Sequence, residues 1–176
     1  MKIISIVSTL VILLFAGAAQ AEDRVTVDPI SPVTVRKGSS APVQITLHVQ
    51  PGFHINSSKP LTPELIPTHI GFTPPEDLVI AKVQYPAGVL MSFPFDPATK
   101  LSVYSGEVSV KAVVIPAPQG GTGTYTVHGE VKYQACDNNS CYPPKRMPIA
   151  FDVKVTSASS KGTTARPTRT SPHIHN

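Results

Sequence analysis

The sequence VQITLHVQPG, residues 43–52, decides the fold. Apolar residues stand at every odd position from Val43 to Val49, and polar residues stand between them. A period of two is typical of a β-strand that buries one face. Pro51-Gly52 then favours a turn, because proline fixes its φ angle and glycine tolerates conformations that other residues avoid. The stretch therefore predicts a half-buried strand that ends in a reversal.

Similar short apolar segments occupy most of the chain on both sides of this strand. Turn residues separate them roughly every 8–12 positions. The further segments are 25–27, 33–35, 68–72, 78–85, 108–114, 125–133 and 149–155. Seven or eight such strands in about 130 residues predict an all-β fold, an immunoglobulin-like antiparallel β-sandwich.

Composition supports this fold class. Proline accounts for 19 of the 176 residues, about twice its usual share. Scattered prolines exclude a helix bundle or coiled coil, because each interior proline removes a helical hydrogen bond and clashes with the preceding turn. Proline and glycine together stay below the share expected of a low-complexity chain.

The two ends of the chain differ from its body. An apolar run follows Lys2 and ends in Ala19-Gln20-Ala21, the pattern of a secretion signal with its cleavage site. The run is short for a membrane anchor, which is the alternative interpretation. The last residues are rich in Ser, Thr, Gly and Pro and cannot build a core. We expect a signal peptide at 1–21, one domain at 22–155 and a disordered tail at 156–176.

The net charge of +4 comes from the two ends of the chain. Residues 22–155 carry 11 basic and 11 acidic residues, whereas the tail carries Lys161, Arg166 and Arg169 and no acid. A basic surface for nucleic acid needs clustered charge on the folded body. The distribution therefore argues against a nucleic-acid partner.

Cys136 and Cys141 flank Asp-Asn-Asn-Ser, four turn-forming residues. They face each other across a tight reversal, with Cα atoms expected about 5.5 Å apart, and a disulfide can form in an exported protein. A loop of about six residues gains only roughly 2 kcal/mol from such a bond. From the spacing alone, a redox pair and a structural hairpin staple remain equally open.

Copper binding is a third interpretation of these residues. Cys136, Cys141, His54, His128 and Met147 include the ligand types of a copper site. However, no histidine follows closely after the second cysteine, and two cysteines so close together favour each other. We therefore expect no metal and no organic cofactor.

Residues 86–100 predict a loop, since three prolines interrupt the segment. The segment is nevertheless apolar, with Val89, Leu90, Met91, Phe93 and Phe95. Solvated loops are normally polar. We therefore expect this loop to lie on another part of the molecule.

Read together, Tyr133-Gln134-Ala135-Cys136 and Cys141-Tyr142-Pro143-Pro144-Lys145 resemble the active-site hairpin of the amino-terminal periplasmic domain of the thiol–disulfide interchange reductase DsbD. The resemblance covers about Val25 to Val155. It includes three more segments in the family's order: Gly52-Phe53-His54-Ile55-Asn56, Tyr85-Pro86-Ala87-Gly88 and Val103-Tyr104-Ser105-Gly106.

The resemblance implies a periplasmic thiol–disulfide oxidoreductase, a monomeric electron carrier without a cofactor. Its donor would be a membrane thiol–disulfide reductase, and its acceptors would be oxidised thioredoxin-like proteins. By the same resemblance, Cys141 forms the mixed disulfide with partners and Cys136 is the resolving thiol. The segment 89–99 corresponds to a cap loop, with Phe93 and Phe95 as lids over the sulfurs.

Three other side chains are candidates for lining the sulfur site. Tyr133 and Tyr142 flank the cysteines, although plain packing explains them equally well. His54 would favour the thiolate if it were a nearby imidazolium, and a surface position at a strand end is its simpler interpretation. A rival from another class is a binding module, whose disulfide is a staple and whose apolar loop is a docking surface.

Overall fold

A computed structural model of the protein describes residues 23–94 and 96–158. The expected signal peptide at 1–21, the proposed lid Phe95 and the tail from residue 159 onward lie outside the described residues. The described part of the chain consists of strands, turns and bends without a helix. None of its segments therefore forms a helix that could span a membrane.

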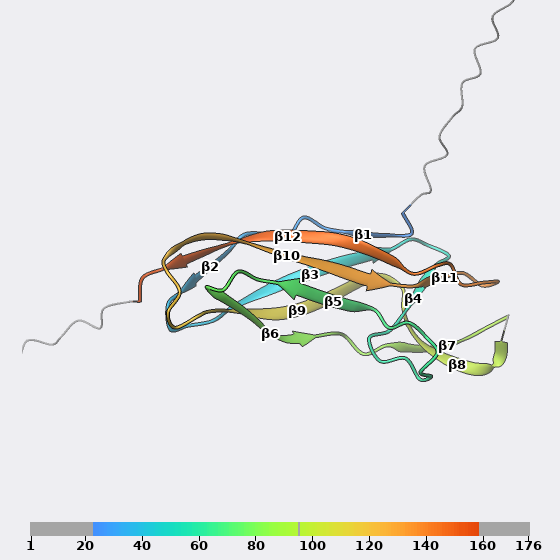
Figure 1. The fold of residues 1–176 in the computed structure, drawn as a ribbon. Helices are drawn as coiled ribbons and strands as arrows, with labels where there is room; N and C mark the ends of the chain where they lie inside the picture. The colour runs from blue at the N-terminus through green and yellow to red at the C-terminus, as the bar shows by residue number, and fades with distance from the viewer. Residues whose placement is uncertain (1–22, 95, 159–176) are drawn as a thin grey trace, which may run out of the picture.

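Within the described residues, twelve strands form three four-stranded sheets, and Figure 1 labels the strands. In spatial order, the first sheet contains β1 (Val25–Val27), β3 (Ala41–Val49), β9 (Gly106–Pro116) and β6 (Leu78–Gln84). The second contains β2 (Val33–Arg36), β12 (Lys145–Thr156), β10 (Gly123–Tyr133) and β5 (His69–Thr73). The third contains β11 (Ala135–Cys136), β4 (His54–Asn56), β8 (Asp96–Tyr104) and β7 (Val89–Phe93).

The expected immunoglobulin-like β-sandwich is confirmed, with one parallel pair inside it. In the part of the chain that the structure describes, all strand pairs are antiparallel except β2 with β12, where Val33 lies opposite Val153. The parallel pair joins strands from opposite ends of the chain, and no local sequence pattern encodes such a pairing.

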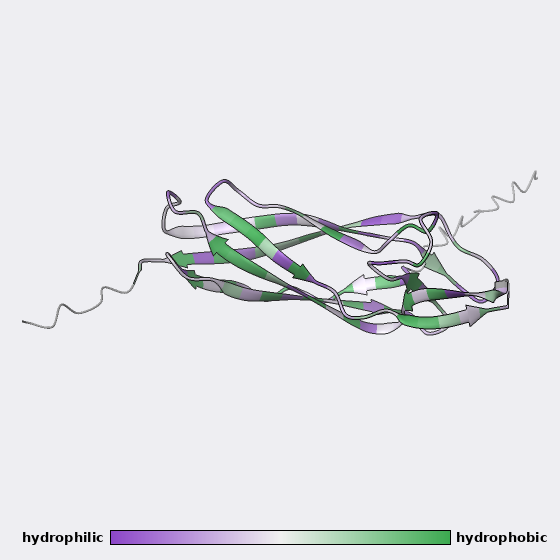
Figure 2. Cartoon of the chain, turned by 90° about the horizontal axis from the view of Figure 1, so that it is seen from below, coloured by the Kyte–Doolittle hydropathy of each residue, from purple (hydrophilic) through white to green (hydrophobic). Residues whose placement is uncertain are grey.

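The core lies between the first two sheets and is built from the alternating positions. Val43, Ile45, Leu47 and Val49 of β3 are all buried, while the residues between them face outward or are half-buried. Figure 2 shows the same alternation of hydrophobic and hydrophilic residues along the long strands. Inward side chains of two facing sheets interdigitate in such a core.

Residues 86–100 differ from the expectation of a loop, because they contribute to a hairpin of β7 and β8. The register shifts between the pairs Met91–Leu101 and Phe93–Asp96. This irregularity takes Pro97 out of the regular ladder, a setting in which sheets tolerate proline, and Pro86 and Pro94 lie outside β7 and β8. The prolines therefore shape the hairpin without preventing it.

The hairpin is only partly covered, contrary to the expectation that the whole segment lies on the molecule. Phe93 is 4% exposed and packs with Leu101 and Val103 in a small second cluster. Val89 and Leu90, by contrast, are 60% and 55% exposed. The third sheet thus presents an apolar edge at one end of the sandwich (Figure 1).

Candidate redox site

Cys136 and Cys141 form a disulfide between directly opposite residues of a small hairpin. Backbone hydrogen bonds of 2.9 Å from Asp137 N and Tyr142 N flank the pair on either side. In an antiparallel ladder this arrangement defines a non-hydrogen-bonded pair, in which the chains approach most closely. The Cα atoms are 3.9 Å apart, closer than the expected value. The turn residues therefore bring the sulfurs together as the sequence indicated.

The two cysteines differ sharply in exposure. Cys136 is 0% exposed in the short strand β11, whereas Cys141 belongs to the exposed return arm of the hairpin. An attacking thiolate must approach one sulfur of a disulfide and expel the other. In this structure, Cys141 is therefore more accessible to an attacker from solvent than Cys136.

His54 is buried beside Cys136, so its interpretation as a surface residue is wrong. β4 and β11 pair with His54 directly opposite Cys136, and directly opposite side chains have Cβ atoms about 4.5–5.5 Å apart. The side chain is 3% exposed, and its Nε2 has no hydrogen-bond partner among the described residues. Burial lowers the pKa of His54, although the carboxylate of Asp137 opposes this shift. The imidazole therefore loses its proton at a lower pH than an exposed histidine does.

Phe93, one of the two expected lids, stacks on this histidine. The two ring centroids are 3.9 Å apart with an angle of 15° between the planes. The stack links the β7–β8 hairpin to the residue opposite Cys136. Of the two expected lid residues, Phe93 thus reaches the site through His54, and Phe95 lies outside the described residues.

Tyr142 is held between charged and aromatic neighbours. The Cζ atom of Arg24 lies 3.5 Å from the centroid of the Tyr142 ring, a cation–π geometry. The ring of Phe53 lies 6.0 Å away. The hydroxyl donates a 2.6 Å hydrogen bond to Asp137 Oδ2, and this bond raises the pKa of Tyr142. The residue after Cys141 is therefore fixed on several sides.

Asp137 caps the turn between the cysteines. Its Oδ1 accepts hydrogen bonds from Asn139 N at 2.7 Å and Ser140 N at 2.9 Å. The bond from Tyr142 and these two backbone bonds lower the pKa of Asp137. The sequence marked these residues as turn-forming, but it did not single out Asp137 or the distant Arg24 as part of the site.

The sequence profile of the family described as "Thiol:disulfide interchange protein DsbD, N-terminal" matches residues 21–152. The chain belongs to this family. It is a thiol–disulfide interchange domain, and its cysteine pair is Cys136–Cys141. Among curated proteins, no sequence matches it significantly.

The solved structures to which this chain is similar include the amino-terminal domains of two proteins, DsbD and ScsB. The DsbD N-terminal domain of Neisseria meningitidis in the reduced form is 18% identical, with 64% of this chain and 77% of that chain covered, at a TM-score of 0.41. The N-terminal periplasmic domain of ScsB from Proteus mirabilis is 14% identical, with 75% of this chain and 47% of that chain covered, at a TM-score of 0.44. A ScaB type I cohesin from Pseudobacteroides cellulosolvens is 13% identical, with 85% and 98% covered, at 0.45. The family assignment rests on the sequence profile.

The remaining residues of the DsbD-like hairpin motif have structural contacts. Gln134 Nε2 donates to the carbonyl of Tyr142 at 3.1 Å, and Asn56 Nδ2 donates to Gln134 Oε1 at 3.5 Å. Gln134 therefore ties the hairpin to β4. Tyr133 lies at the end of β10, is buried in the main core, and its pKa is raised by that burial.

The other DsbD-like segments secure the base of the β7–β8 hairpin. Tyr104 accepts a hydrogen bond from Ser58 N at 3.2 Å and donates one to the carbonyl of Pro86 at 2.9 Å. At Gly88 a Cβ atom would lie 2.7 Å from Ser57 Cβ. Only glycine fits this close approach without a shift of the neighbouring chain.

The residues of the copper interpretation are not brought together as a set. Cys136 and Cys141 are bonded to each other. His128 is an exposed residue within β10, opposite Ala150, and Met147 pairs with Val131. Within the described residues, no three His, Cys, Asp or Glu side chains form a potential metal cluster.

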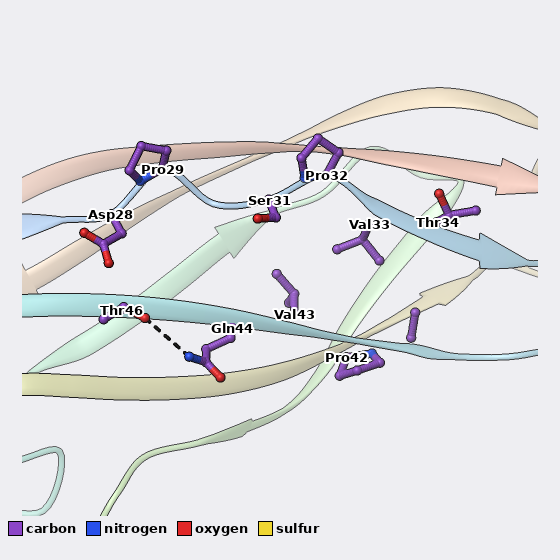
Figure 3. Close-up of a pocket in the computed structure, with 11 residues that line it drawn as sticks. Asp28, Pro29, Ser31, Pro32, Val33, Thr34, Pro42, Val43, Gln44 and Thr46 are labelled. Carbon is purple, nitrogen blue, oxygen red and sulfur yellow. Dashed lines mark hydrogen bonds between the residues drawn. The ribbon is translucent and has the colours of Figure 1, made fainter.

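A separate cavity of about 450 Å³ lies between the β1–β2 connection, β2 and β3 (Figure 3). It is lined by Asp28, several small or proline side chains, and Gln44, whose Nε2 donates to Thr46 Oγ1 at 3.4 Å. None of its lining residues belongs to the third sheet or the cysteine hairpin. It is therefore distinct from the redox site.

Proposed function

We propose that this protein is a periplasmic electron carrier between a membrane thiol–disulfide reductase and oxidised thioredoxin-like proteins. The observation that supports it best is the unequal exposure of the two bonded cysteines, Cys141 outside and Cys136 fully buried. Such asymmetry supports different roles for the two sulfurs in the proposed exchange. Membership of the DsbD N-terminal family supports thiol–disulfide exchange as the reaction.

The proposed reaction consists of two exchange steps. The Cys141 thiolate attacks the disulfide of the acceptor, forms a mixed disulfide and expels one acceptor thiolate. The Cys136 thiolate then attacks the Cys141 sulfur, restores the Cys136–Cys141 disulfide and releases the second acceptor thiolate. Two electrons and two protons pass to the acceptor in total. The membrane reductase returns them by the reverse steps.

His54 accepts the proton of the Cys136 thiol in this proposal. A buried thiolate is unfavourable without a proton acceptor or cation, because burial disfavours the charged form. His54 lies opposite Cys136 and its buried Nε2 has no partner among the described residues while the disulfide is intact. The thiol of the reduced state would supply that partner.

The β7–β8 hairpin supplies the surface for partners. Val89, Leu90 and Met91 are exposed on an edge strand of the same sheet that carries Cys136. Phe93, on the same strand, covers His54. We expect Phe93 and Phe95 to limit access to the sulfurs until a partner displaces the hairpin.

The organisation of the whole chain completes the proposal. Residues 1–21 direct export and are removed, residues 22–155 form the interchange domain, and residues 156–176 form a tail without a core. We expect the mature protein to act as a monomer in the periplasm and to need no cofactor.

The proposal is tested by redox equilibration followed by trapping. In glutathione buffers, the wild-type disulfide should titrate between about −180 and −270 mV, the range of exchange proteins. The Cys136→Ala variant should then form a stable mixed disulfide with a purified, oxidised periplasmic thioredoxin-like protein. Mass spectrometry should locate the bond at Cys141.

The matched control is Cys141→Ala, which keeps only the buried thiol. It should trap at most a small fraction of the partner that Cys136→Ala traps. A disulfide that stays oxidised below about −300 mV is a structural staple. That result, or equal trapping by the two variants, would reject the carrier and favour the binding module.

A further inference from the structure

Reduction removes the covalent bond that joins the two arms of the cysteine hairpin. The thiols of Cys136 and Cys141 must nevertheless remain close, since the second exchange step requires Cys136 to reach the Cys141 sulfur. A six-residue loop of turn-forming residues would otherwise sample many conformations. Some noncovalent contact must therefore hold the arms together in the dithiol state.

Asp137 makes contacts on both arms. Its Oδ1 accepts from Asn139 N and Ser140 N at 2.7 and 2.9 Å within the turn. Its Oδ2 accepts from the hydroxyl of Tyr142 at 2.6 Å on the return arm. Asp137 directly follows Cys136, and Tyr142 directly follows Cys141. The carboxylate thus bridges the two arms immediately beside the disulfide, and charge-assisted hydrogen bonds of this kind are short and strong.

The return arm is also attached to the body of the domain. Arg24 precedes β1 and stacks on the Tyr142 ring at 3.5 Å. Gln134 holds the carbonyl of Tyr142 at 3.1 Å. None of these contacts involves a sulfur atom. They are therefore all available to the reduced protein.

We propose that Asp137 is a positioning residue that keeps Cys136 and Cys141 opposite each other in the dithiol state and so sets the redox equilibrium of the pair. The inference rests on the proposed function, because it gives Asp137 a role in thiol–disulfide exchange. The lowered pKa of Asp137 agrees with it, since the bonds from Tyr142, Asn139 and Ser140 favour the ionised carboxylate.

The proposal predicts the direction in which the redox equilibrium of the pair shifts when the Asp137 contacts are lost. The measured equilibrium is the oxidation of the dithiol by oxidised glutathione, which gives the disulfide and two molecules of reduced glutathione. A pre-arranged dithiol loses little freedom when the disulfide closes, which raises the effective concentration of one thiol at the other. Loss of the Asp137 bridge should therefore favour the dithiol.

The experiment measures this equilibrium constant for the full mature protein. Asp137→Ala should lower it about tenfold, which makes the reduction potential about 30 mV less negative. Asp137→Asn keeps the acceptor oxygen for the turn and can donate to Tyr142, so its constant should stay within about threefold of wild type. Asn138→Ala, at an exposed residue of the same turn, is the matched control and should also stay within that range.

Tyr142→Phe provides a second, milder test, because it removes only the hydrogen bond from the Tyr142 hydroxyl to Asp137 and keeps the ring against Arg24. Its constant should fall by about threefold. The inference is overturned if the equilibrium constant of Asp137→Ala equals that of wild type. It is also overturned if the constant of Asp137→Asn or of Asn138→Ala falls as far as that of Asp137→Ala.

Failure of the inference is distinguishable from failure of the proposed function. If the wild-type disulfide equilibrates with glutathione and Cys136→Ala traps its partner, an unchanged Asp137→Ala rejects only the positioning role. If the wild-type disulfide does not equilibrate at all, the carrier proposal fails and Asp137 is a structural turn residue.

Discussion

The body of the sandwich and the end that carries the cysteines are built from different kinds of contact. Between the two large sheets, the buried side chains of β3, β9, β10 and β12 are apolar. The buried polar residues within the described chain lie in the third sheet or are bonded to it. They are His54, Asn56, Ser57, Thr68 and Ser102.

The same end holds the buried polar atoms that lack a hydrogen-bond partner within the described residues, namely Arg24 Nε, His54 Nε2 and Asn56 Oδ1. Such groups are unfavourable and rare in native structures. Their concentration around one disulfide indicates that the sandwich supplies the stability and that the third sheet supplies the groups for thiol–disulfide exchange. Substitutions should therefore separate into two classes.

The largest expected effect is on stability, from a cavity in the sandwich. Leu47→Ala at a fully buried position of β3 should lower the free energy of unfolding by about 2–5 kcal/mol, because it removes apolar contacts and leaves a void. Urea denaturation of the oxidised protein measures this. The folded variant should keep its redox equilibrium constant with glutathione within about twofold.

The comparison variant for Leu47→Ala removes the disulfide at the other end of the molecule. A double Cys136→Ala, Cys141→Ala protein should lose all exchange but only about 2 kcal/mol of stability, as expected for so short a loop. If the double variant is destabilised more than Leu47→Ala, the disulfide is a major structural element and the division between the two regions is wrong.

The sequence predicted the two regions unequally, for a physical reason. Strands of the sandwich alternate with period two, so β3 and most of the core were visible locally. The cysteine turn was also local. β4, however, is buried on both faces and shows no alternation, and its pairing with β11 joins residues far apart in sequence.

Other features of the site depend on long-range contacts in the same way. No local pattern connects Arg24 with Tyr142, or His54 with Phe93. Residues 86–100 were predicted as a loop because of their prolines, but Pro86 and Pro94 lie outside the two strands and Pro97 lies in the irregular part of the ladder. The spacing paired Cys136 with Cys141, whereas only the family resemblance linked Phe93 to them.

A smaller effect is expected on kinetics from His54→Gln, which keeps a polar side chain but removes the base. Reduced protein treated with a chromogenic aromatic disulfide should release the first aromatic thiolate through Cys141 and the second through Cys136. His54→Gln should slow the second phase about tenfold at pH 7, a modest effect for a lost proton acceptor, and leave the first phase unchanged.

The pH profile separates a base from a packing residue. Burial lowers the pKa of His54, so the wild-type second phase should level off once pH exceeds that pKa. The His54→Gln rate should keep rising with pH as the thiol itself ionises. His128→Gln, at an exposed histidine of β10, should behave as wild type. If the second-phase rates of His54→Gln and wild type depend on pH in the same way, His54 is a packing residue under Phe93 and not a base.

The smallest effect is expected on the surface of the sandwich, where His48 Nε2 lies 2.9 Å from Asp28 Oδ2. The hydrogen bond to Asp28 raises the pKa of His48 above its ordinary value of 6.5. The folded protein therefore binds this proton more tightly than the unfolded chain. The resulting stabilisation is complete below about pH 6.5 and is lost as pH rises through the raised pKa.

The stability difference between wild type and His48→Gln should accordingly be larger at pH 5.5 than at pH 8.5, and high salt should reduce it because the pair is exposed. Denaturation midpoints at the two pH values measure this. The redox constant of the cysteine pair should not respond to the substitution, since His48 belongs to the sandwich. A shifted redox constant in His48→Gln would mean that the sandwich surface and the third sheet are coupled, and the two regions could no longer be treated as independent.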